Sequence, residues 1–346
     1  MANEKKTVRE PSFILALIPI VAMIGFMLYC FRGHSESGYH DAHMPLVLSI
    51  VVACIVGAIC GHSFKEMLAG MIERLAASME AVLILCTVGF LVSSFMASGA
   101  IPSLIVYGLD LLTPKLFLPV GCILCAIVGM ACGSSWTTTA TIGLAFLGIG
   151  AGLGIPAPIT AGMIISGAYV GDKFSPLSDT TNLAAAVAET GLFDHVTAMV
   201  STTGPTLLLS LILYTILGLN VDTSAYDATV AEGIQEAFRG AFTISPILLL
   251  PIIVVIVMCI LRVPGLVGIA ISVATATIFM MIFQSTDIYG SRALGDIFNM
   301  LHNGIVVETG NDVADSILGK AGGMNGTMWT INLILLALAY GGALER

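Results

Sequence analysis

The chain has 346 residues, of which 57% are hydrophobic and only 10% are charged, and its formal net charge is −9. Soluble domains contain about 25% charged residues, so this composition excludes an ordinary soluble domain. The acidic charge also argues against binding to nucleic acid, which relies on clustered Lys and Arg. Apolar runs of about 18 or more residues recur along the chain, and they predict an all-α, polytopic membrane protein.

The N-terminal part of the chain contains three predicted spans. The run at 11–31 is longer than the apolar core of a cleaved signal peptide, so we interpret it as a retained first span. A second span is expected at 44–61. The amphipathic segment 64–79 is predicted to lie at the membrane interface, and a third span follows at 80–96. The short apolar segment 101–114 is predicted to be interfacial or re-entrant.

The later apolar runs are interrupted more often. The run at 116–132 breaks at "GSSWTTTATIG", 133–143, and apolar sequence resumes through 144–156. A further run at 157–170 leads into the polar stretch "GDKFSPLSDTTN". The remaining predicted spans lie at 198–218, 244–261, 264–283 and from 329 to the end. We therefore expect about nine or ten transmembrane helices, some of them broken or re-entrant.

The basic residues predict the orientation of the chain. Lys5, Lys6 and Arg9 place the N-terminal segment 1–10 in the cytoplasm, because cytoplasmic segments are enriched in Lys and Arg. The membrane domain then covers 11–346. Two acidic segments, 222–239 and 287–320, are expected on the outside.

The sequence contains no motif typical of an enzyme or of a resident metal. Cys122 and Cys125 form a CxxC, but it lies inside an apolar run without hydrophilic ligands nearby, so packing is the favoured interpretation. His34, His40 and His43 cluster in a short loop expected outside, and the pattern does not favour a metal site there. GxSxG, HExxH and P-loop patterns are absent from the sequence. We therefore expect no enzymatic activity and no cofactor.

The stretch "GDKFSPLSDTTN", 171–182, concentrates charge in an apolar region. Only five residues between Lys115 and Asp222 are charged, and all lie in one short interval: Asp172, Lys173, Asp179, Glu189 and Asp194. A charge inside a bilayer costs about 2.5–3.5 kcal/mol on insertion scales, so such residues mark either a solvated loop or a functional site. The proline at 176 and the Ser/Thr/Asn run predict that a helix ends near Val170 and restarts near Leu183.

Such a break would bring oxygen atoms together, and Na⁺ prefers oxygen ligands at discontinuous helices. The candidate ligands are Asp172, Ser175, Ser178, Asp179, Thr180, Thr181 and Asn182. A plain solvated loop with a helix cap at Asp179 or Thr180 stays open as the alternative.

Two further features are weaker candidates. The hydroxyls of Ser134, Ser135 and Thr137 could complete an oxygen cage, or they could form hydrogen bonds in a packed bundle. His195 could relay protons, but the favoured interpretation is a residue at a helix start, with Asp194 as the cap.

The motifs at 133–199 and 308–345, above all GDKxSPLSDTTN, resemble the NhaC family of Na⁺/H⁺ antiporters, which belongs to a superfamily of helical-hairpin secondary carriers. The resemblance covers nearly the whole chain from about Pro11. It implies exchange of Na⁺ for H⁺ in a bacterial or archaeal inner membrane. Na⁺ and H⁺ would compete at Asp172 and Asp179, with the proton bound at acidic pH and Na⁺ at alkaline pH.

The resemblance also raises two alternatives. Some relatives exchange organic acids such as malate and lactate with coupled Na⁺ and H⁺, so small organic acids are alternative substrates. Family members also continue beyond 341–345 into a second repeat with its own broken helix. We therefore expect this chain to be the first repeat of an inverted-repeat carrier, truncated at the C-terminus. It would then be a fragment that needs a second-half polypeptide, or a homodimer, in addition to membrane lipids.

Overall fold

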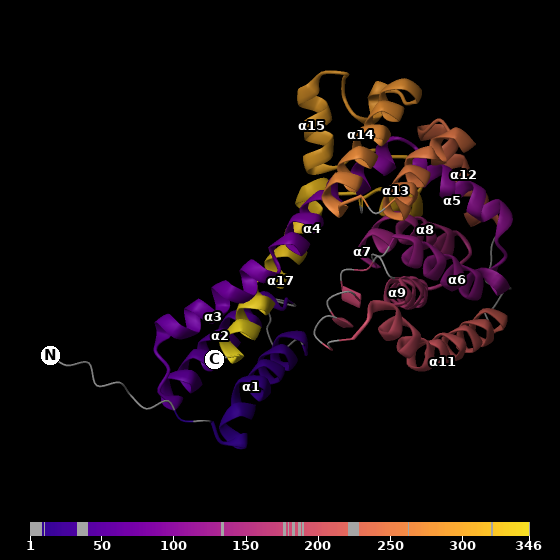
Figure 1. Cartoon of the computed structure of the whole chain (residues 1–346). Coiled ribbons are helices and arrows are strands. Elements are labelled where there is room, and N and C mark those ends of the chain that lie inside the picture. The colour runs from indigo at the N-terminus through magenta and orange to yellow at the C-terminus, as the bar shows by residue number, and fades with distance from the viewer. Residues whose placement is uncertain are drawn as a thin grey trace. The chain divides into compact units, whose positions relative to one another are not determined.

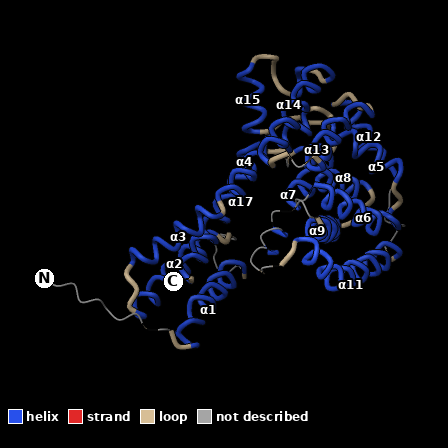
Figure 2. The backbone as a smooth tube through the Cα atoms, viewed as in Figure 1, coloured by secondary structure: helices blue, strands red, loops and turns tan. Residues whose placement is uncertain are grey.

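The structure is a computed structural model that describes residues 9, 11–32, 41–132, 135–175, 178, 180–181, 184–185, 188, 190–220, 228–261, 263–319 and 321–345. All regular secondary structure in these residues is helical, as Figure 2 shows, so the all-α prediction is confirmed. In chain order the elements, most of which are labelled in Figure 1, are α1 (Phe13–Phe31), α2 (His43–Cys60), α3 (Phe64–Ala77), α4 (Met79–Ala97), α5 (Ala100–Leu111), α6 (Pro114–Cys132), α7 (Ser135–Thr138), η1 (Thr139–Gly143), α8 (Leu144–Gly152), α9 (Ala157–Phe174), α11 (Leu192–Leu219), α12 (Ala228–Ala241), η2 (Pro246–Leu249), α13 (Leu250–Ile260), α14 (Gly265–Phe283), η3 (Thr286–Ile288), α15 (Leu294–Asn303), α16 (Asp312–Leu318) and α17 (Gly323–Leu344).

Five helices among the described residues are long and apolar enough to cross a membrane, namely α1, α2, α11, α14 and α17. The bent pairs α3–α4 and α12–α13 raise the number to seven if each pair is one span, and the second pair bends by 90°. The chain is therefore a polytopic membrane protein with broken helices. Several apolar runs of the sequence form shorter helices, because glycines, prolines and hydroxyl residues divide them.

The chain divides into two compact units. The first unit comprises Met1–Cys86 and Thr327–Arg346, and the second comprises Thr87–Gly326, so the boundary passes through α4 and α17. In the first unit, α2, α3 and α17 pack through the buried side chains of Ala53, Met71 and Tyr340. A Cβ at Gly342 would lie 2.6 Å from the carbonyl oxygen of Gly70, so α17 and α3 meet backbone to backbone.

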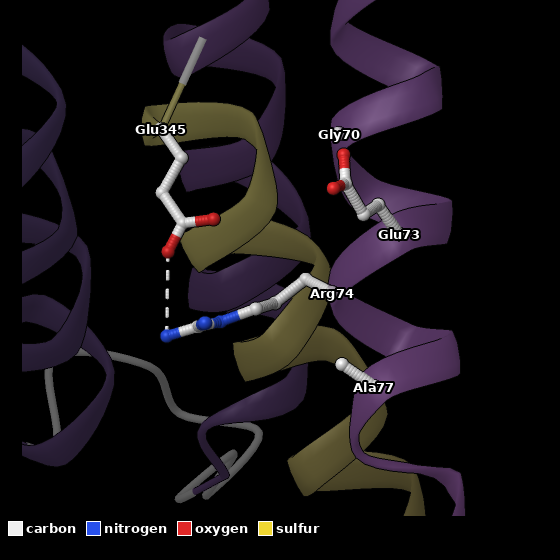
Figure 3. Close-up of a pocket in the computed structure, with 5 residues that line it drawn as sticks. All are labelled: Gly70, Glu73, Arg74, Ala77 and Glu345. Carbon is white, nitrogen blue, oxygen red and sulfur yellow. Dashed lines mark ion pairs between the residues drawn. The ribbon is translucent and has the colours of Figure 1, made fainter. Parts of the chain in front are cut away.

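Helix α3 is the amphipathic helix that the sequence predicts. Ser63 and Glu66 form a capping box at its start, which satisfies two backbone N–H groups that the helix leaves unpaired. Figure 3 shows a pocket beside this helix, lined by Gly70, Glu73, Arg74, Ala77 and Glu345. Arg74 pairs with Glu345 at 3.3 Å, and both are about half exposed. Such exposed pairs contribute at most about 1 kcal/mol to the free energy of unfolding.

A polar clasp joins the start of α2 to α17 in the first unit. The Asp41 carboxylate contacts His43 Nδ1 at 2.5 Å and accepts a hydrogen bond from Trp329 Nε1 at 3.0 Å. His43 Nε2 lies 3.2 Å from the Trp329 carbonyl oxygen, and the two rings pack edge to face. The hydrogen bond from His43, and to a smaller extent that from Trp329, lowers the pKa of Asp41 from its ordinary 3.8 to about 2. His34 and His40, the other two histidines of the predicted cluster, lie outside the described residues.

We predict that Asp41→Asn destabilises the protein in a pH-dependent way. Because the pKa of Asp41 is lowered on folding, its contribution is complete above about pH 4 and is lost as the pH falls through about 2. The difference in thermal midpoint between the unmodified protein and Asp41→Asn, measured in detergent from pH 5 to pH 2, should therefore shrink toward zero. Trp329→Phe should show a smaller difference with the same pH dependence. A difference that stays constant over this range would contradict the assignment.

In the second unit, one buried amide closes two helix breaks. Gln284, at the end of α14, donates from Nε2 to the carbonyls of Ser98 at 3.0 Å and Thr243 at 3.1 Å. Its Oε1 accepts from the Thr243 N–H at 2.9 Å. Ser98 and Gly99, which has a φ of +80°, separate α4 from α5, and Thr243 lies at the bend between α12 and α13. The amide thereby satisfies backbone groups that no helix pairs.

The prediction for 101–114 needs a correction. An interfacial helix exposes one face to water or lipid. The first two turns of α5 lack such a face, since Ala100, Ile101, Ile105 and Val106 are all fully buried. It packs against α8, η2 and α12 within the second unit. The burial of α5 does not fit the interfacial alternative, because neighbouring helices cover the segment, and the re-entrant alternative stays a prediction.

Candidate functional site

Helix α9 ends inside the polar stretch, but later than predicted. It continues through Asp172 and Lys173 to Phe174, and Ser175 then adopts an extended backbone with ψ 123°. A residue before proline avoids the helical region, so the proline at 176 explains the break at Ser175. Helical backbone is present again at Thr180 and Thr181. The predicted break is therefore real but shorter, and Asp172 belongs to the last turn of α9.

The described residues of the stretch form a buried polar cluster. Ser175 and Ser178 are fully buried, and Thr181 and Asp172 are 1% and 5% exposed. Thr180 is exposed. The chain after the break thus folds back over the end of α9, and the interpretation as a plain solvated loop does not fit this burial.

Thr181 caps the end of α9. Its hydroxyl donates to the carbonyl of Asp172 at 3.3 Å and lies 3.5 Å from that of Lys173. Its N–H donates to Ser178 Oγ at 3.3 Å. The last carbonyls of a helix lack the usual partners within the helix, and here the Asp172 carbonyl accepts from both the Ser175 N–H at 3.2 Å and the Thr181 hydroxyl.

A chain of hydrogen bonds leads to the Asp172 carboxylate. Thr180 Oγ1 donates to Asp172 Oδ2 at 3.3 Å. Lys173 Nζ donates to the same Thr180 oxygen at 3.0 Å, and Ser178 Oγ lies 3.0 Å from it. The Thr180 hydroxyl thus links the Lys173 ammonium to the Asp172 carboxylate.

Glycines hold this cluster against α6. A Cβ at Gly171 would collide with the Ala126 carbonyl oxygen and lie 2.7 Å from the Met130 nitrogen, and one at Gly129 would lie 2.8 Å from the Ala168 oxygen. A Cβ at Gly167 would meet the backbone of Cys122 in the same way. Figure 1 shows α9 nearly end-on between α6 and α11, which it contacts. The spacing of Gly167 and Gly171 is a GxxxG pattern, a signal of close helix approach that our sequence interpretation missed.

The segment "SSWTTTATIG" forms the second irregularity. It begins with α7 and continues as the π-helical turn η1, and both contact α9. Ser135 is 7% exposed and Thr138 is fully buried. The hydroxyl of Thr139 donates to the Ser135 carbonyl at 2.8 Å, and that of Thr141 to the Thr138 carbonyl at 3.3 Å. The π-helical turn η1 is therefore a second interruption of regular α-helix beside α9, and single π-helical turns are frequent at functional sites.

Several predicted ligands cannot be placed. Asp179, Asn182 and Ser134 lie outside the described residues, as does the side chain of Thr137. A shared site of Asp172 and Asp179 therefore stays a prediction.

His195 lies in the first turns of α11. The sequence predicted Asp194 as the helix cap, and this prediction is wrong. Gly191 is the N-cap residue, and it makes no side-chain hydrogen bond. Asp194 instead lies in the first turn, where a negative charge is favourable near the helix N-terminus. The Nε2 atom of His195 is buried and has no hydrogen-bond partner among the described residues. A role in proton relay stays a prediction.

We predict that Gly171→Ala disturbs the site through the backbone of α6. A Cβ there meets main-chain atoms that cannot rotate away, so the variant should lose about 1–3 kcal/mol of stability and lower the thermal midpoint in detergent. Gly162→Ala is the matched control on the same helix, because its Cβ would meet only the Tyr214 hydroxyl at 3.5 Å. Equal midpoints for the two variants would contradict the close contact of α6 and α9.

Comparisons with known proteins add an independent finding. A family model described as the Na⁺/H⁺ antiporter family matches residues 167–346. The chain is 37% identical to the arginine/ornithine antiporter ArcD of Halobacterium salinarum over 97% of its length and 68% of the relative's. It is 34% identical to the Na⁺/H⁺ antiporter NhaC of Alkalihalophilus pseudofirmus (88% of this chain, 64% of the relative). It is 33% identical to the malate-2H⁺/Na⁺-lactate antiporter of Bacillus subtilis, over 99% of this chain and 70% of the relative.

The chain thus spans about two thirds of the length of these relatives. No solved structure matches it.

Proposed function

The chain belongs to the Na⁺/H⁺ antiporter family, and we propose that it is a secondary active transporter that exchanges Na⁺ for H⁺ at Asp172. The observation that carries the proposal is a carboxylate, only 5% exposed, at the broken end of a helix in a membrane protein. A buried negative charge is costly unless a proton neutralises it or a cation pairs with it. The buried Asp172 carboxylate therefore favours the binding of either H⁺ or Na⁺.

The surrounding groups fit both states. With Asp172 ionised, the Thr180 hydroxyl donates to it, and the Thr180 and Ser178 oxygens lie within reach of a cation beside the carboxylate. With Asp172 protonated, the Thr180 hydroxyl can turn and accept, because a hydroxyl both donates and accepts. The end of α9 adds a partial negative charge that favours a cation. Alternate occupation by Na⁺ and H⁺ is then an exchange reaction if the site opens to either side in turn.

A second candidate is the exchange of small organic ions, since the chain is similar to antiporters named for arginine and ornithine and for malate and lactate. The Thr180 oxygen already accepts a hydrogen bond from the ammonium of Lys173, so it could accept one from the ammonium group of a substrate in the same way. Uptake of labelled arginine, malate or lactate into vesicles separates this candidate from pure Na⁺/H⁺ exchange, which moves none of them.

We further infer that the chain acts in the cell membrane with its N-terminus in the cytoplasm, as a carrier and not as an enzyme. Membership of an antiporter family and the apolar helices support a carrier in a membrane, and Lys5, Lys6 and Arg9 support the orientation. Na⁺ and H⁺ are cargo, and no cofactor is expected. A second-half polypeptide, a second copy of the chain and membrane lipids stay the proposed partners.

We predict that Asp172→Asn lowers Na⁺-driven proton flux in inside-out vesicles, followed with a pH-sensitive dye, by roughly a hundredfold or more. Two unit charges in contact attract each other by a few kcal/mol in partly screened surroundings, and about 1.4 kcal/mol corresponds to a tenfold change. Asp194→Asn is the matched control, because it removes the same charge from an exposed position on α11. Full flux in folded Asp172→Asn protein would refute the site.

A further inference from the structure

Lys173 takes up a position that a transported cation also needs. Its ammonium lies 3.0 Å from Thr180 Oγ1, and this oxygen in turn lies 3.3 Å from Asp172 Oδ2. A hydroxyl has one hydrogen and two lone pairs. The hydrogen of Thr180 points to Asp172, so Lys173 and Ser178 occupy the two lone pairs. The hydrogen-bonding capacity of the Thr180 oxygen is therefore full.

A cation can coordinate this oxygen only if one of the two donors leaves. Ser178 is fully buried, and its oxygen also accepts the Thr181 N–H at 3.3 Å, so its departure would break a second hydrogen bond in the protein interior. Lys173 is partly exposed and has a long, flexible stem whose ammonium can return to water. The donor that leaves at lower cost is Lys173.

We propose that the Lys173 ammonium is a tethered internal cation that competes with transported Na⁺ for Thr180 Oγ1 beside Asp172. This inference rests on the proposed function at Asp172. In the empty site Lys173 compensates the carboxylate through Thr180, and Na⁺ replaces it on binding. Lys173 thus lowers the affinity for Na⁺ and helps to release the bound ion.

The first experiment measures equilibrium binding of labelled Na⁺ to the purified full chain in detergent. Lys173→Met should bind Na⁺ roughly tenfold more tightly, the size expected for the loss of a partly exposed, charge-assisted hydrogen bond. Lys173→Arg keeps a cation and should stay close to the unmodified protein. Lys115→Met removes the same charge from an exposed position at the start of α6 and should leave binding unchanged. Unchanged or weaker binding by Lys173→Met would overturn the proposal.

A double-mutant cycle separates competition at the hydroxyl from a simple effect of charge. In Thr180→Val protein, where the shared oxygen is gone, Lys173→Met should change Na⁺ affinity less than about twofold. An equally large effect of Lys173→Met in both backgrounds would show that Lys173 acts only through space, and it would overturn the inference.

A third measurement needs no variant. Reaction of the Lys173 amine with a lysine-specific reagent, followed by mass spectrometry, should increase when Na⁺ replaces choline, because the ammonium is released. Labelling of Lys115 should not change. Constant labelling of Lys173 while Na⁺ binds would overturn this inference alone, whereas failure of the unmodified chain to bind Na⁺ would overturn the proposed function as well.

Discussion

The backbone contact between α6 and α9 is the constraint on which the candidate site depends. Glycines at 129, 167 and 171 carry no side chain into this contact, so the main chains of the two helices approach closely near the end of α9. In a bilayer, close packing replaces the hydrophobic effect as the force that holds helices together, and small residues make it possible. Asp172 follows Gly171 directly, so this contact fixes the backbone that carries the carboxylate.

Because α9 stops there, its last carbonyls need partners, and the chain supplies them locally. Thr181 returns to cap two of them, and Ser178 receives the Thr181 N–H. The same helix end carries a partial negative charge in addition to the charge of Asp172. Both effects favour a positive charge, which explains why a lysine is tolerated in the last turn of a helix so poor in other charges.

The sequence predicted much of this site but not its connections. The proline at 176 and the hydroxyl residues after it are local signals, and they correctly predict a break and a cluster of oxygens. The length of α9 was underestimated, because nothing in Asp172 or Lys173 themselves prevents a helix from continuing. The burial of α5 and the bonds of Gln284 to Ser98 and Thr243 depend on segments far apart in the chain, and no local pattern encodes them. The exception is the GxxxG spacing in α9, which is local and was available.

The two kinds of helix break in the second unit differ in a way that bears on function. At Gln284 a neutral amide spends both of its donor hydrogens and one lone pair of its oxygen on backbone groups, so three hydrogen bonds would be lost if the side chain moved, and the amide has no charge to attract an ion. At the end of α9 the Thr181 hydroxyl caps the backbone, while the Asp172 carboxylate accepts from Thr180, whose oxygen also accepts a hydrogen bond from the flexible, partly exposed ammonium of Lys173. A break closed entirely by fixed neutral groups serves structure. In the proposed mechanism Na⁺ replaces the Lys173 ammonium at Thr180, and this replacement of one cation by another is the chemical property that a carrier requires.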